Sequence, residues 1–204
     1  TGRNPVSAVC TICNKRRAKR PCHATSTEIC VLCCAEAREI TLDCPRECSF
    51  LQEARKHESL VKLTPADVPH RDIVVSEDFV RDQEWVVLWL GNALTRAMER
   101  TKAVDSNARE ALDAIVKRQR GIESRPEDPI SAELAEALET AIAQWRTKAP
   151  EEGGPGPLKD SELLGVLIFI QRLGLQYNNG RVRGRRFYDF MMDHFPTQSD
   201  GAGA

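Results

Sequence analysis

All eight cysteines of this 204-residue chain lie within its first 48 residues. Their positions are Cys10, Cys13, Cys22, Cys30, Cys33, Cys34, Cys44 and Cys48. A segment this short cannot bury enough apolar surface to hold itself folded. In a Cys-x-x-Cys pair, both sulfurs can converge on one tetrahedral ion. The pattern therefore predicts a zinc-binding module in a reducing, cytoplasmic setting, with disulfides in a secreted mini-domain as the alternative.

Eight thiolates are sufficient for two closed four-ligand sites, so we expect two structural Zn²⁺ ions. The spacing C-x2-C-x16-C-x2-C assigns the first site to Cys10, Cys13, Cys30 and Cys33. The second site is then left with Cys22, Cys34, Cys44 and Cys48. A sequential division is the alternative, with Cys10, Cys13, Cys22 and Cys30 on one ion. The division of the adjacent Cys33 and Cys34 stays open. His23 beside Cys22 is a further candidate ligand, although eight sulfurs already suffice and a surface loop histidine is the simpler interpretation.

Residues 10–48 resemble the cross-brace, treble-clef-like binuclear zinc modules of the HIT, MYND and B-box type. The matching positions are three ligand pairs, Cys10 with Cys13, Cys30 with Cys33, and Cys44 with Cys48. The chain departs from the family pattern after Cys22, where Thr25 stands near the place of a further ligand and Cys34 or His23 would substitute. The resemblance covers under a quarter of the chain. It implies a protein-interaction role without identifying a partner.

The rest of the chain has helical periodicity and capping signals. Five helices are expected: Ser76 to about Arg100, Asp105 or Ser106 to Gly121, Asp128-Pro129 through Trp145, Asp160 to about Gln176, and Arg181 to Phe195. The fold class is therefore mostly α, with a small N-terminal binuclear zinc module followed by an all-α helical bundle. The expected domains are residues 5–62 and 70–196, with a loop at 149–157 and a disordered tail at 197–204.

The net charge of -1 conceals a basic N-terminal part, because residues 1–62 carry 11 Lys/Arg against 7 Asp/Glu while residues 63–170 carry 13 against 20. Two basic clusters are candidate anion or nucleic-acid contacts. The first comprises Lys15, Arg16, Arg17, Lys19 and Arg20, and the second comprises Arg181, Arg183, Arg185 and Arg186. Arginine forks bind phosphate or carboxylate groups in bidentate fashion. A solvated loop and local ion pairs are the respective alternatives.

The sequence contains no recognisable catalytic motif, and its cysteines are committed to metal. We therefore expect a non-enzymatic adaptor or regulator that binds another macromolecule, most simply a protein. Nucleic-acid binding through the two basic clusters is the alternative, and an enzyme with an unrecognised helical active site is the third reading. The longest apolar stretch, Leu163 to Ile170, is too short to span a membrane. No small-molecule substrate is predicted.

Overall fold

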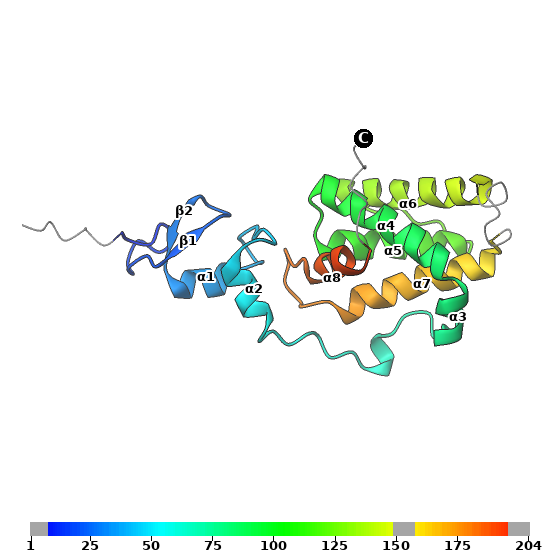
Figure 1. Ribbon diagram of the computed structural model, residues 1–204, viewed down its shortest axis with the longest axis horizontal. Helices are drawn as coiled ribbons and strands as arrows, with labels where there is room; N and C mark the ends of the chain where they lie inside the picture. Colours follow the sequence, from blue (N-terminus) through cyan, green and yellow to red (C-terminus); the bar gives the residue numbers. More distant parts are fainter. Residues whose placement is uncertain (1–7, 149–157, 196–204) are drawn as a thin grey trace, which may run out of the picture. The chain divides into compact units, whose positions relative to one another are not determined.

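The computed structural model describes residues 8–148 and 158–195 (Figure 1). The chain is mostly α-helical with one two-stranded sheet, which confirms the predicted fold class. It divides into two compact units, which we call the N-terminal unit (Thr1–Ser59 with Arg181–Gly184) and the helical unit (Leu60–Gly180 with Arg185–Ala204). The predicted loop at 149–157 and tail at 197–204 lie outside the described residues.

The N-terminal unit contains one hairpin and two short helices. Its elements are β1 (Arg20–Cys22), β2 (Thr27–Ile29), α1 (Val31–Ala37) and α2 (Ser49–Arg55). The strands are antiparallel, with Arg20 opposite Ile29 and Cys22 opposite Thr27. Because β2 ends one residue before Cys30, the hairpin delivers that cysteine to the start of α1.

The buried core of the N-terminal unit is small and rich in sulfur. Apart from cysteines, its buried apolar side chains among the described residues are Ala18, Ile29, Leu42 and Leu51. One buried ion pair joins Glu39 to Arg55 at 2.7 Å, with both side chains under 9% exposed. So few aliphatic side chains cannot stabilise a unit of this length, which fits the expectation that metal does so.

The helical unit is built from six α-helices and one 3-10 helix within the described residues. They are η1 (Pro65–Asp67), α3 (Glu77–Asp82), α4 (Glu84–Thr101), α5 (Asp105–Gln119), α6 (Pro129–Lys148), α7 (Asp160–Gln176) and α8 (Arg186–His194). Central α7 is buried over most of its surface, as its almost continuous apolar sequence predicts. No helix in the described ranges combines the length and hydropathy needed to cross a membrane.

Several helix ends follow from local capping. The Ser76 hydroxyl accepts a hydrogen bond from the Phe79 N–H at 3.1 Å, which starts α3. Asp128 Oδ1 accepts from the Ser131 N–H at 3.0 Å, and Pro129 occupies the first turn of α6. Gly121 follows α5 with φ at 77°, a value that glycine adopts without strain. These predicted boundaries are confirmed.

Two predicted helices are wrong in their extent. The expected helix from Ser76 to Arg100 is broken at Gln83, whose φ and ψ of -102° and 16° end α3 before α4 begins. The expected last helix starts at Arg186 rather than Arg181. The preceding residues make other bonds instead, since the Arg183 N–H donates to the Glu39 carbonyl at 2.8 Å within the N-terminal unit.

A buried carboxylate joins α5 to α8. Asp105 is 2% exposed, and its two oxygens accept hydrogen bonds from the Phe187 and Tyr188 N–H groups at 3.0 Å each. The sequence predicts that this α5 helix starts at Asp105 or Ser106, and Asp105 is the first residue of α5. Its carboxylate satisfies the free N–H groups of α8.

Candidate metal centre and interaction surface

Four cysteines form one tight group in the N-terminal unit. The Sγ atoms of Cys10, Cys13, Cys30 and Cys33 all lie within 4.8 Å of one another, a geometry that can hold a metal ion. Cys13 is half-buried and the other three are buried. These are the four residues that the C-x2-C-x16-C-x2-C spacing groups together, and Cys22 of the sequential alternative is not among them.

Each pair of ligands is held by a tight backbone turn. The Asn14 N–H donates to the Cys10 carbonyl at 2.8 Å, and Asn14 has φ at 50°, a left-handed value that asparagine tolerates. In the second pair, Cys30 is the N-cap of α1, and its sulfur accepts a hydrogen bond from the Cys33 N–H at 3.4 Å. Local geometry therefore turns both sulfurs of each pair to the same side.

Burial and hydrogen bonding shift the pKa values of Cys10 and Cys33 in opposite directions. Burial raises the pKa of the Cys10 thiol, but backbone N–H groups of Cys13, Cys30 and Ile12 outweigh burial and lower this pKa to about 6. Burial, together with contacts to the neighbouring cysteines, raises the pKa of Cys33 to about 12. Four thiolates at this range repel one another, and the positive charge of a bound cation offsets that repulsion. A thiol also loses its proton when it binds a metal ion, so the same cation favours the thiolate form.

The other four cysteines line one small cavity. Cys22, Cys34, Cys44 and Cys48 all border one cavity of about 10 Å³ in the N-terminal unit. That volume is close to the minimum for one water-sized occupant. His23 also borders this cavity, although its side chain is exposed overall. Among the described residues, the tight sulfur grouping itself is seen for the first set alone.

Two arginines surround Cys34 in this second set. Arg20 Nη1 donates to Cys34 Sγ at 3.4 Å, and Arg38 Nη2 approaches the same sulfur at 3.9 Å. The Arg20 guanidinium also lies 4.6 Å from the centre of the Phe50 ring. Arg20 is half-buried and already held by contacts within the N-terminal unit.

The remaining residues of the first basic cluster are more exposed than Arg20. Lys15, Arg16, Arg17 and Lys19 are all exposed. Contact with the Cys30 side chain raises the pKa of Arg16. The first basic cluster is thus held directly beside the four-cysteine group, as expected for a loop between ligands.

The second basic cluster is divided between the two units. Arg181 belongs to the N-terminal unit, where Nη1 donates to the Arg38 carbonyl at 2.7 Å and Nε lies 3.6 Å from Glu58 Oε1. Arg185 belongs to the helical unit, where its guanidinium donates to the Ala103 and Lys102 carbonyls. Arg183 is exposed and Arg186 is half-buried. Two of the four arginines are therefore used in bonds to backbone carbonyls.

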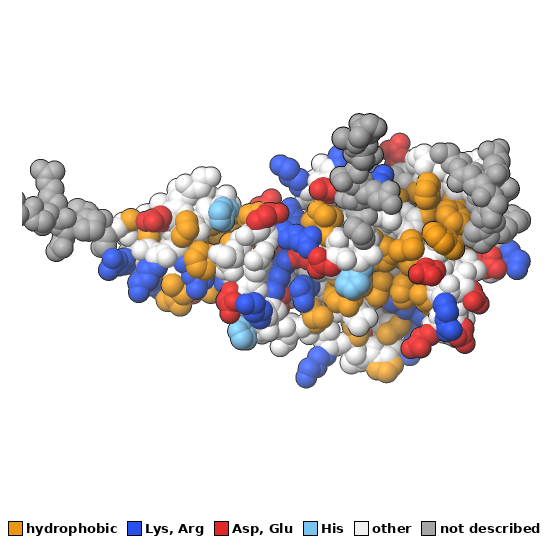
Figure 2. All heavy atoms as spheres, viewed as in Figure 1, with side chains coloured by type: hydrophobic (Ala, Val, Ile, Leu, Met, Phe, Trp, Pro, Cys, Tyr) orange, Lys and Arg blue, Asp and Glu red, His pale blue; other side chains and the backbone are white. Residues whose placement is uncertain are grey.

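An apolar surface on the paired cysteine turns was missed by the sequence reasoning. Between the ligands stand Ile12, Val31 and Leu32, which are 42%, 41% and 49% exposed. Val9 precedes the first ligand and is 53% exposed. The sequence does contain a signal for this surface, namely the position of these residues between the two cysteines of a Cys-x-x-Cys pair. When both cysteines turn inward, the residues between them face outward. Figure 2 shows hydrophobic and basic side chains next to each other on this unit.

Comparison with known proteins adds no assignment, since no protein-family model, no curated protein and no solved structure matches this chain. What stands is the cluster of four cysteines that can hold a metal ion.

Proposed function

We propose that this protein is a non-enzymatic adaptor or regulator of a reducing intracellular compartment. In it, two structural Zn²⁺ ions hold the N-terminal unit in the shape that binds a partner protein. Four sulfur ligands in one group would fill a tetrahedral ion and leave no position for water or substrate, which favours a structural over a catalytic role. The second ion would be held by the four cysteines that line the 10 Å³ cavity, Cys22, Cys34, Cys44 and Cys48.

The observation that carries protein binding is the exposed aliphatic surface of the two cysteine turns. Because the four sulfurs of these turns meet within 4.8 Å, a single ion would hold Ile12, Val31 and Leu32 near one another. Exposed aliphatic side chains on a rigid frame favour contact with another protein. They offer little to a phosphate backbone, which is bound by cations and hydrogen-bond donors.

The charge around this surface supports a partner of a particular chemistry. Lys15, Arg16 and Arg17 are exposed on the loop that follows the first turn. Complementary charge at the rim of an interface steers association and excludes wrong partners. The partner we propose therefore presents an apolar centre bordered by Asp or Glu.

Nucleic-acid binding is the second candidate, because Lys15, Arg16, Arg17 and Lys19 are exposed together on one loop. Such a contact would release counterions and weaken steeply as salt rises. The bonds of Arg181 and Arg185 to backbone carbonyls weigh against a contribution from the second basic cluster.

The test is affinity purification of the zinc-loaded full chain from its native cells, with recovered proteins and nucleic acids both identified. Leu32→Ser removes aliphatic surface, and a double charge reversal at Arg16 and Arg17 removes the cations. Val74→Ser is the matched control, because Val74 is an 84%-exposed aliphatic residue of the helical unit. Zinc content measured for every variant shows that the N-terminal unit still forms.

We expect a stoichiometric protein partner that is retained by Val74→Ser and lost by Leu32→Ser. Recovery of nucleic acid that depends on Arg16 and Arg17 and on low salt would select the second candidate instead. A partner recovered equally well by Leu32→Ser would overturn the proposed surface, and a metal-free native protein would overturn the proposed frame.

A further inference from the structure

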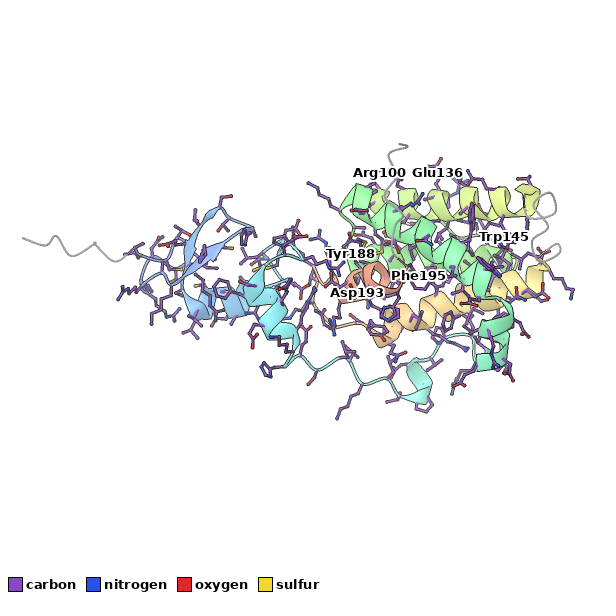
Figure 3. The ribbon with its side chains drawn as sticks, viewed as in Figure 1. Arg100, Glu136, Trp145, Tyr188, Asp193 and Phe195 are labelled. Atoms are coloured by element: carbon purple, nitrogen blue, oxygen red, sulfur yellow. The ribbon has the colours of Figure 1, made fainter. Side chains whose placement is uncertain are left out.

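A groove of about 1350 Å³ runs along helices α4 and α6 of the helical unit. The helices are antiparallel, since Arg100 pairs with Glu133 at 3.0 Å near one end while Trp89 Nε1 donates to the Ala141 carbonyl at 2.8 Å further along. Figure 3 shows Arg100 and Glu136 near one end of this helix pair and Trp145 towards the other. The groove therefore has one end rich in charge and one end rich in tryptophan.

All three tryptophans of the chain line this groove. The Trp89 and Trp145 rings lie 5.9 Å apart between centroids, and Trp85 is 66% exposed. The lining also includes the small residues Ala93 and Ala137, which leave room for an occupant. Exposed tryptophan beside small apolar residues is characteristic of binding surfaces, where aromatic anchors contribute most of the affinity.

Two buried polar atoms in the groove lining lack a hydrogen bond to any described residue. They are the Asn92 Oδ1 acceptor and the Trp145 Nε1 donor. Both atoms lie below the accessible surface of the lining, so the size, the tryptophans and the charges of the groove select its occupant.

The size of the groove decides the class of occupant. Small-molecule pockets are usually about 300 to 1,000 Å³, which is less than this groove holds. A helix rises about 1.5 Å per residue, so the α4 stretch from Trp85 to Arg100 spans about 22 Å, or four helical turns. We propose that the groove binds an amphipathic helix of about four turns from a partner protein, with apolar residues at i, i+4, i+7 and i+11 facing the tryptophans.

The charges on the two walls of the groove determine the direction in which the partner helix binds and where its own charged residues lie. Arg96 on α4 and Glu136 on α6 are exposed, and neither forms an ion pair with a described residue. The bound helix therefore carries an acidic residue on its α4 side and a basic residue on its α6 side, both at the end away from the tryptophans. This surface belongs to the helical unit and does not depend on the proposed zinc-held surface.

The test selects displayed peptides of about 16 residues, with the apolar positions fixed and the others random, on the zinc-loaded full chain. Tryptophan fluorescence reports occupancy directly because the chain has no tryptophan outside the groove. Trp85→Ala removes an exposed anchor and should weaken binding about 30-fold. Ile122→Ser is the matched control, since Ile122 is 54% exposed and does not line the groove.

Charge exchange tests the orientation. Arg96→Glu should weaken the selected peptides about tenfold, and replacing the peptide's acidic residue by Lys should restore binding. The proposal is overturned if no peptide is selected, or if selected peptides leave the fluorescence unchanged or bind Trp85→Ala as tightly as the original chain. Peptides whose binding is weakened by Leu32→Ser but not by Trp85→Ala would bind the N-terminal unit, and that result would also overturn the proposal. A fluorescence shift with protein concentration alone would identify a second copy of the chain as the occupant.

Discussion

Replacing Gly91 with alanine tests how α8 is seated against α4, the helix that forms one wall of the groove. A Cβ atom at this position would lie 2.6 Å from Cε1 of Phe195 and would also clash with Cδ1, well inside van der Waals contact. Phe195 is 6% exposed, so its ring cannot move aside without losing burial. Overpacking of this kind costs about 1–3 kcal/mol, and the higher helix propensity of alanine returns up to about 1 kcal/mol. With a cost in the upper half of that range, we expect a net destabilisation of about 1–2 kcal/mol.

Gly174→Ala is the matched control within the same unit. Its Cβ would lie 3.6 Å from Phe187 Cε1, an ordinary contact distance, so the propensity gain should remain and stabilise the unit by up to about 1 kcal/mol. Urea unfolding followed by tryptophan fluorescence is the assay, because all three tryptophans belong to the helical unit. The expected order of midpoints is Gly174→Ala, then the original chain, then Gly91→Ala.

A double variant separates the clash from other effects. If Phe195 is first replaced by Ala, the Gly91→Ala change should no longer destabilise, because the ring that the new methyl group meets is gone. Equal midpoints for Gly91→Ala and Gly174→Ala, or an unchanged cost in the absence of Phe195, would refute the packing of this ring on α4.

Three further predictions concern the metal and the caps. Cys22→Ser should reduce bound zinc from two ions to one by native mass spectrometry, and complete loss of zinc would contradict the independent second site. Chelation should expose all cysteines to alkylation while the tryptophan-reported urea midpoint stays unchanged, whereas a parallel fall would show that the two units unfold together. Asp105→Ala should cost about 1–3 kcal/mol in the same urea assay, because it leaves two N–H groups of α8 unpaired; a cost near zero would disprove that cap.

Local signals were sufficient for much of the helical unit. Ser76, Asp128 and Gly121 mark helix ends correctly because the bonds or dihedral angles that define these ends involve residues at most three positions apart. The buried residues of α5, such as Leu112 and Ile115, follow from the 3.6-residue period in the same way. The four-cysteine group follows from ligand spacing, since each tight turn brings its own two sulfurs together.

Features that depend on distant residues were missed. The break at Gln83 has no proline or glycine to signal it, and the close approach of Phe195 to Gly91 joins residues far apart in the sequence. Trp85 falls in the apolar pattern of α4 yet is 66% exposed, because the helices packed on α4 cover its other side. Apolar periodicity shows that a helix has an apolar face without showing whether a neighbour covers it.

The amino-acid sequence by itself determined that sulfur concentrates in the first 48 residues and that helices follow, since ligand spacing, capping and periodicity are properties of a few consecutive residues. Only the tertiary structure decided that Asp105 caps a helix 82 residues away, that Ile12, Val31 and Leu32 surround one sulfur group, and that the three tryptophans line a single groove. The physical reason is that these contacts join residues far apart in the sequence, and the packing of the whole unit decides which distant segments meet.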